Sequence, residues 1–203
     1  MVIKRPMLPE VAPGESPKTC RRCTLWEYAT QSVEGEGAAQ ARVMLVGEQP
    51  GDEEDLHGRP FVGPAGRVLN EALVAAAMAR KDVFITNAVK HFKWEPRGKQ
   101  RLHKKPGLTE IYACEVWLER EIAAVKPNVI VALGTTALRA LTGANLSIKE
   151  ARTRKLCHLS GALILGTYHP SAILRAPQGG EELRAQLIDD LRLAARMITA
   201  ASE

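Results

Sequence analysis

Residues 42–52 read Arg-Val-Met-Leu-Val-Gly-Glu-Gln-Pro-Gly-Asp, an apolar run that ends abruptly in a turn. Residues 42–46 show no polar alternation, which is typical of a strand covered by helices on both faces. Three more runs share this character, at residues 83–86, 129–133 and 163–166. Because helical patterns separate the four runs, the sequence predicts an α/β fold of three layers, α/β/α, around a short four-stranded parallel sheet.

Helical periodicity fills the intervals between these runs. The segments are 65–80, 108–125, 135–141 and 181–200. Residues 1–17 contain four prolines and predict an irregular N-terminal arm, followed by a short helix over 20–29 and a loop over 31–40. Because no repeat is visible, we expect residues 1–203 to form a single domain.

Positive charge is concentrated in one segment. The chain has a net charge of +5 and a pI near 9.1, and residues 90–105 contain seven basic residues against one acid, Glu95. The basic residues are Lys90, Lys93, Arg97, Lys99, Arg101, Lys104 and Lys105. This pattern is compatible with an anionic partner. No apolar run is long enough for a membrane span or a signal peptide, which predicts a cytoplasmic protein without membrane contact.

Ligands of such sheets bind beyond the carboxyl ends of the strands. This rule selects residues 47–52, 87–105, 134–136 and 168–175. The turn 47–52 contains two glycines and a proline. It can point backbone N–H groups and carboxylates into a pocket, or it is a simple connection between strand and helix.

Three side chains near these ends suit recognition of a nucleobase. Phe61, between two prolines, can stack on a planar base or staple the next helix. Asn87 offers a donor and an acceptor to a base edge, or serves as a turn residue. His169, fixed by a following proline, can present a ring nitrogen to a substrate oxygen. The apolar pair Ile173 and Leu174 forms either a wedge into a base stack or part of the core.

The chain has four cysteines. Cys20 and Cys23 form a Cys-x-x-Cys pair, which suggests metal or redox chemistry in a reducing compartment. With Cys114 they supply three ligands, and the candidates for a fourth are Cys157 and His91. Spacing alone does not separate zinc from iron–sulfur.

Together these segments resemble the uracil-DNA glycosylase superfamily, from Cys20 to the last helix. The resemblance is carried by residues 47–51, residues 60–66, Asn87 and His169-Pro170-Ser171, in the family's order and spacing. It implies excision of uracil from DNA. The cysteines are similar to those of the iron–sulfur subfamilies, which implies a [4Fe–4S] cluster rather than zinc.

Two departures from the ordinary iron–sulfur enzymes are similar to one branch, the X-type enzymes (UdgX). Gln49 stands where those enzymes have alanine, and His91 stands in place of a cysteine. The branch also inserts a basic loop, Lys-Arg-Arg-x-His, and here residues 99–103 read Lys-Gln-Arg-Leu-His, with Gln100 departing from the pattern. The resemblance implies four cluster ligands, Cys20, Cys23, His91 and Cys114. Cys157 is then expected to be a buried core thiol.

The resemblance also implies how the base is held. Phe61 stacks on uracil, Asn87 bonds its amide edge, and His169 donates to its O2 as negative charge develops. Backbone groups around Gln49 and Gly51 hold the ring.

In the X-type branch the loop histidine bonds to the DNA sugar. His103 is therefore expected to attack C1′ in place of water, releasing free uracil and leaving a covalent adduct after a single turnover. Glu48 is the candidate for orienting His103 and taking its proton, and Asp52 is the alternative. Expected contacts to DNA, here a single strand bound by a monomer, come from Lys99, Arg101, Ser171 and Arg175.

Other interpretations remain open. A conventional glycosylase would use an activated water and turn over. A non-enzymatic, metal-containing nucleic-acid-binding protein would bind DNA without releasing uracil, with an affinity that falls steeply with salt. A nucleotide-binding α/β protein lacks support because the chain has neither a Gly-x-Gly-x-x-Gly nor a P-loop pattern. In each of these, His103 is a surface residue of a phosphate-binding loop.

Overall fold

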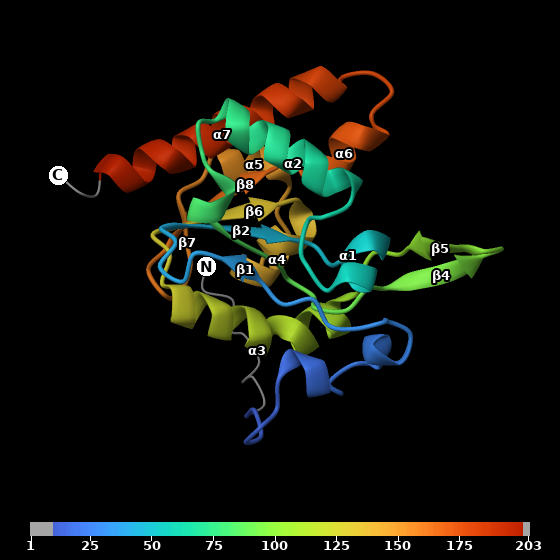
Figure 1. The fold of residues 1–203 in the computed structure, drawn as a ribbon. Helices are drawn as coiled ribbons and strands as arrows, with labels where there is room; N and C mark the ends of the chain where they lie inside the picture. The colour runs from blue at the N-terminus through green and yellow to red at the C-terminus, as the bar shows by residue number, and fades with distance from the viewer. Residues whose placement is uncertain (1–9, 201–203) are drawn as a thin grey trace.

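The computed structural model describes residues 10–200 and contains a six-stranded sheet in the order β1-β3-β2-β6-β8-β7 (Figure 1). The four central strands run parallel, which confirms the predicted α/β/α fold with its four-stranded parallel sheet. They are β3 (Phe84–Asn87), β2 (Val43–Gly47), β6 (Val129–Leu133) and β8 (Leu163–Thr167). Two short antiparallel strands, β1 (Glu36–Gly37) and β7 (Leu156–Cys157), extend the two edges.

Helices cover both faces of this sheet. One face is packed by α2 (Pro64–Ala75), α6 (Pro170–Arg175) and α7 (Gly180–Ala200), which lie above the sheet in Figure 1. The other face is packed by α3 (Leu108–Val125), α4 (Thr135–Thr142) and α5 (Ile148–Arg152). Each face has its own hydrophobic cluster, because every side chain of β2 and β6 is buried.

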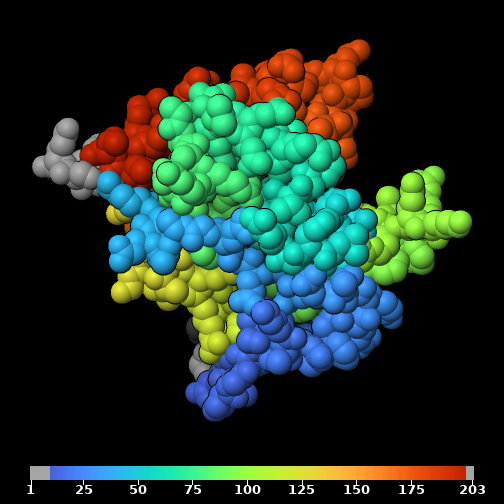
Figure 2. Space-filling view, viewed as in Figure 1, coloured from blue at the N-terminus to red at the C-terminus, as the bar shows by residue number. Residues whose placement is uncertain are grey.

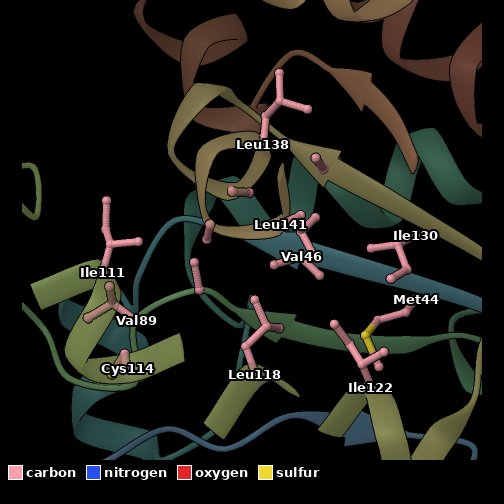
Figure 3. Packing of buried hydrophobic residues seen from close by; sticks show 14 of the residues in the cluster. Met44, Val46, Val89, Ile111, Cys114, Leu118, Ile122, Ile130, Leu138 and Leu141 are labelled. Carbon is pink, nitrogen blue, oxygen red and sulfur yellow. The ribbon is translucent and has the colours of Figure 1, made fainter. Parts of the chain in front are cut away.

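On the α3 face, apolar side chains of the central strands pack against the apolar face of helix α3. Met44 of β2 and Ile130 of β6 point toward Leu118 and Ile122 of α3 (Figure 3). All four side chains are almost completely buried. Burial of one such side chain stabilises a fold by roughly 1.5–3 kcal/mol, so this face anchors α3 beneath the sheet.

Several short elements escaped the sequence analysis. Helix α1 (Asp52–His57), helices α5 and α6 and the edge strands are too short to show a period. The helix expected over residues 20–29 is replaced by 3₁₀ turns at Pro17–Thr19 and Thr24–Glu27. The prediction that Cys157 is a buried core thiol was wrong, because edge strand β7 leaves it exposed.

A two-stranded hairpin forms part of the basic segment. Strand β4 (Trp94–Arg97) pairs with β5 (Gln100–His103), and the hairpin projects from the body of the molecule (Figure 2). Gly98 has a φ of +60° at the first of the two turn positions, where a two-residue hairpin turn favours glycine. The hairpin places His103 at its base, next to the carboxyl end of the sheet.

No helix in residues 10–200 is long and apolar enough to cross a membrane. Residues 1–9 of the predicted N-terminal arm lie outside the described part of the chain. Residues 10–16 contain no helix or strand. The single-domain assignment stays a prediction.

Candidate active site

A cavity of about 580 Å³ opens beyond the carboxyl ends of β2, β3 and β8. Its position follows the rule for ligand sites in parallel sheets. It brings together ten of the residues singled out in the sequence: Gln49, Gly51, Asp52, Phe61, Asn87, His103, His169, Ser171, Leu174 and Arg175. Glu48 lies in an adjoining cavity of about 660 Å³, which shares His103 and His169 with the first.

Two glycines make room for the aromatic wall of the cavity. Phe61 is buried and takes a left-handed φ of +53°, a conformation that non-glycine residues rarely adopt. A Cβ on Gly66 would lie 1.9 Å from the Phe61 carbonyl oxygen, and a Cβ on Gly47 would lie 2.6 Å from the Phe61 ring. The loop therefore holds the ring in one place, 5.7 Å from the ring of His169.

Asn87, the last residue of β3, faces the same space. Its side chain is 2% exposed, and within the described residues its Oδ1 has no hydrogen-bond partner. A Cβ on Gly47 would approach this oxygen to 2.3 Å. A buried, unpaired acceptor is costly, so Asn87 is arranged for a ligand that brings an N–H donor.

His169 is held as a neutral donor. Its Nδ1 accepts the Ser171 backbone N–H at 3.1 Å and lies 2.7 Å from the Ser171 hydroxyl. Because Nδ1 accepts, the proton of the neutral ring resides on Nε2. Burial, followed by the charges of Arg175 and His103, lowers the His169 pKa to about 4. The ring is therefore neutral near pH 7 and can donate from Nε2.

His103 presents Nε2 to two residues of the first turn. This nitrogen lies 3.0 Å from the Gln49 side-chain nitrogen and 3.6 Å from Glu48 Oε1. Because an amide nitrogen only donates, Gln49 donates this hydrogen bond and His103 Nε2 accepts it. Burial, aided by Arg175 and opposed by Glu48, lowers the pKa of His103. Near pH 7 it is thus a neutral imidazole, the form that can act as a nucleophile.

The two candidate carboxylates differ in their partners. Glu48 directs Oε1 toward His103, while its Oε2 accepts a hydrogen bond from the buried Thr136 hydroxyl. Asp52 instead forms an ion pair with Nε of Arg101. Glu48 is therefore the carboxylate oriented to serve His103. Its supporting residue Thr136 lies in the selected segment 134–136, where no role had been predicted for it.

The Gln49 side chain clamps the base of the hairpin. Its Oε1 accepts the Lys93 N–H at 3.2 Å, and its Nε2 lies 2.9 Å from the Lys104 carbonyl oxygen and 3.2 Å from that of Lys93. Lys93 and Lys104 flank the two hairpin strands, and Lys104 directly follows His103. The glutamine and the histidine-bearing loop are thus parts of one structure, in addition to the predicted role of Gln49 in holding the base.

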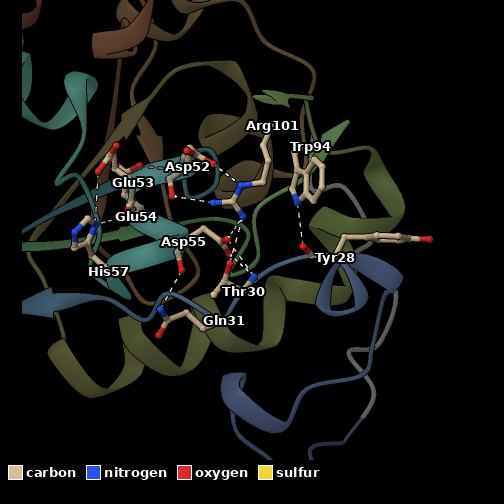
Figure 4. A network of polar contacts seen from close by, with 11 residues as sticks. Tyr28, Thr30, Gln31, Asp52, Glu53, Glu54, Asp55, His57, Trp94 and Arg101 are labelled. Atoms are coloured by element: carbon tan, nitrogen blue, oxygen red, sulfur yellow. Dashed lines mark hydrogen bonds and ion pairs between the residues drawn. The ribbon is translucent and has the colours of Figure 1, made fainter. Parts of the chain in front are cut away.

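Most of the positive charge predicted for residues 90–105 is neutralised locally. Arg101 contacts the carboxylates of Asp52 and Asp55 (Figure 4). Three lysines of the segment also form ion pairs, Lys90 with Glu121, Lys93 with Glu110 and Lys104 with Glu95. Lys99 is exposed at the hairpin turn, and no ion pair of it occurs within residues 10–200. Lys99 and Arg175 fit the expected phosphate contacts better than Arg101 does.

Three predicted metal ligands are thiols, and two of them accept hydrogen bonds. Cys20 accepts the Trp117 Nε1–H at 3.2 Å, and Cys114 accepts the Lys90 backbone N–H at 3.3 Å. Burial raises the pKa of Cys114 to about 12 and also raises that of Cys23. Cys20 raises both pKa values further, and Cys23 adds to the increase at Cys114.

The fourth predicted ligand, His91, is buried, and burial lowers its pKa, which keeps the ring neutral. In the part of the chain that the structure describes, no group of three or more His, Cys, Asp or Glu side chains is placed closely enough to hold a metal ion. The ligand set therefore stays a prediction.

Comparison with known proteins identifies relatives of this chain. Residues 34–192 match the model of the uracil DNA glycosylase superfamily. A type-4 uracil-DNA glycosylase of Thermotoga maritima is 39% identical over 186 residues, 91% of this chain and 92% of that protein. A type-4 enzyme of Pyrobaculum aerophilum is 38% identical, covering 87% and 88%, and a type-5 uracil-DNA glycosylase of the same organism is 32% identical, covering 77% and 73%. The chain therefore belongs to the uracil-DNA glycosylase superfamily.

Proposed function

We propose that this protein excises uracil from DNA by breaking the N-glycosidic bond. The observation that carries the proposal is the unpartnered Oδ1 of Asn87, buried in the cavity beside Phe61. Uracil offers an N3–H donor to this oxygen, whereas N3 of cytosine is an acceptor and would leave it unpaired. Sites of this kind reject the wrong partner strongly, because a buried polar group then loses its hydrogen bond.

The leaving base must carry negative charge as the bond breaks. The Nε2–H of His169 is available for uracil O2, since Ser171 occupies Nδ1. A neutral donor fixed in place stabilises the developing anion without reorganisation during the reaction. The Phe61 ring holds the base by stacking, which requires that the nucleotide be flipped out of any duplex.

We further propose that His103 captures the sugar. The Gln49 side-chain nitrogen, 3.0 Å from His103 Nε2, can only donate, so Nε2 accepts and the proton of the neutral ring resides on Nδ1. Nε2 exchanges its hydrogen bond from Gln49 for the new bond to C1′, and the electron pair of the broken C1′–N1 bond leaves with uracil. The imidazolium formed loses its Nδ1 proton through solvent to the uracil anion, which departs as neutral uracil.

In this geometry Glu48 stabilises positive charge. Its Oε1 lies 3.6 Å from the attacking nitrogen, close enough to favour both an oxocarbenium-like sugar and the imidazolium. Thr136 holds the other oxygen, which keeps the carboxylate aimed at the reacting atoms. This role differs from the proton acceptance expected from the sequence, because the ring nitrogen facing Glu48 carries no proton.

A denaturing gel tests the two parts of the proposal separately. Wild-type protein incubated with uracil-containing single-stranded DNA should release uracil and give a persistent shifted band. His103→Ser should abolish the band, and Lys99→Ala, on the same hairpin, should retain it. Uracil release without any band would support a conventional enzyme with turnover, and DNA binding without uracil release would overturn the glycosylase proposal.

The thiols and His91 fit an iron–sulfur group by their chemistry. Two of the sulfurs already accept N–H donors, and such hydrogen bonds are a feature of iron–sulfur sites. We propose that Cys20, Cys23, His91 and Cys114 would hold a [4Fe–4S] cluster. When bound, such a group ties together distant segments of the chain, here the N-terminal segment, helix α3 and the residues after β3.

We also propose that the protein acts in the cytoplasm, as a monomer, on single-stranded DNA.

A further inference from the structure

Lys90, three positions after Asn87, has no exposed side-chain surface. Its Nζ lies 2.7 Å from Thr86 Oγ1, 2.7 Å from Glu121 Oε2 and 2.8 Å from the Asn87 backbone oxygen. These three acceptors use all three protons of the ammonium group. Lys90 is thus neither a surface cation nor a DNA contact, although it belongs to the basic segment.

Asn87 depends on its backbone for its orientation. Its Oδ1 accepts no hydrogen bond within the described residues, so this oxygen does not itself hold the amide in place. The following peptide is held on both sides: the Ala88 N–H donates to the Gly47 oxygen at 2.9 Å, and the Asn87 oxygen accepts from Lys90. Loss of the lysine donor would leave a buried carbonyl unpaired and free this peptide to rotate.

We propose that Lys90 is a positioning residue that sets the orientation of the base-reading Asn87 amide. The inference rests on the proposed function and names a residue that acts on the base through Asn87 alone. Lys90 is anchored independently of substrate, since Glu121 also accepts from Thr86 at 2.7 Å and from the Gly35 N–H at 2.9 Å. These contacts therefore hold the Asn87 backbone against the sheet and helix α3, which restricts the side-chain amide that contacts the base.

The backbone of Lys90 also contacts one of the proposed ligands of the iron–sulfur cluster. Its N–H donates to Cys114 Sγ at 3.3 Å, and its carbonyl accepts from the Val33 N–H at 2.8 Å. One residue thus joins a thiol of helix α3 to the residue that reads uracil. The side-chain contact can be removed without touching the backbone contact, which separates the two links experimentally.

The test uses a charge-neutral pair of substitutions. Lys90→Met alone would leave the partly buried Glu121 carboxylate without its cationic partner, which destabilises a protein, so Lys90→Met/Glu121→Gln is the informative variant. We expect kcat/KM for uracil excision, or the single-turnover rate if the adduct forms, to fall about 100-fold, as a misplaced contact group can cause. Iron content should remain that of the wild type, and hydrogen exchange at the Ala88 amide should accelerate.

Two controls decide the interpretation. Thr86→Val removes a hydroxyl from the same set of contacts but leaves the lysine on the Asn87 carbonyl, so its rate should stay close to wild type. Glu119→Gln changes a carboxylate of the same helix that contacts His158 instead. An unchanged rate in the folded double variant, or an equal loss in Thr86→Val, would overturn the inference. Absence of uracil release by the wild type would instead overturn the proposed function, while exchange at Ala88 would still report on the lysine contact.

Discussion

Arg101 Nη1 lies 2.6 Å from Oδ2 of Asp55, a carboxylate with no exposed surface, and this ion pair fastens the β4–β5 hairpin to helix α1. The same guanidinium reaches Asp52 and stacks 5.5 Å from the centre of the Phe92 ring. Asp55 also accepts the Thr30 N–H at 3.0 Å. Arg101 therefore acts as a structural clasp: it holds the hairpin, and with it His103 two positions later, against helix α1.

Replacing Arg101 with alanine should loosen this clasp. Removing one partner of a buried ion pair costs about 3 kcal/mol or more, because the Asp55 charge remains buried. We expect a lower melting temperature and a large loss of crosslinked product. Lys99→Ala, two residues away and exposed, should weaken DNA binding slightly, with crosslinking and melting temperature unchanged. A similar phenotype in both variants would mean that Arg101 acts through phosphate contacts instead.

Gln49→Ala tests the clamp at the base of the hairpin. The substitution removes the side chain that contacts Lys93, Lys104 and His103. We expect the yield of covalent adduct per unit time to fall at least about tenfold, because His103 loses its fixed position. Uracil release should fall much less, since Asn87 and His169 are untouched. Quantifying free uracil and shifted DNA in the same reaction separates these effects, and an equal loss of both would argue against the clamp.

Gly47→Ala should close the base-binding cavity. Its Cβ would lie 2.3 Å from Asn87 Oδ1 and 2.6 Å from the Phe61 ring. Such overpacking typically costs about 1–3 kcal/mol, so the protein should remain folded while uracil release is lost. Gly107→Ala is the control, since its Cβ would meet only the Glu110 carboxylate at 3.3 Å. Normal excision by Gly47→Ala would show that the base binds elsewhere.

The crosslinking rate should depend on the protonation of His103. Burial places its pKa below the ordinary value of about 6.5, and only the neutral ring has a free lone pair. The rate should therefore rise with pH through this lowered pKa and become constant above about pH 7. A rate that still increases between pH 7 and 9 would point to a different nucleophile or base.

The same histidines affect stability, with a sign that can be checked. His103 and His169 both have pKa values lowered by burial, that of His169 to about 4. Between pH 4 and about 6.5 the unfolded chain then binds more protons than the folded chain, so the free energy of unfolding should decrease as the pH falls through this window. Chemical denaturation at several pH values measures this, and His169→Gln should flatten the dependence.

The sequence by itself determined the parallel sheet and the edge at which the site lies. Both follow from local patterns, because a short apolar run rich in valine and isoleucine, such as residues 129–133, is typical of a strand covered on both faces. The turn after β2, Phe61, Asn87 and His169 were selected because they lie near the ends of predicted elements, and the structure places them around one cavity.

Only the tertiary structure decided how the basic segment is used. The carboxylate that binds Arg101 is 46 positions away in the chain, and Glu121, which binds Lys90, is 31 positions away. Composition alone predicts one positively charged surface from these lysines and arginines. In the fold, Lys90 is buried in the core and Arg101 holds the hairpin against helix α1. The choice between Glu48 and Asp52 likewise depended on Thr136 and Arg101, because ion pairing is set by distances that no local sequence pattern encodes.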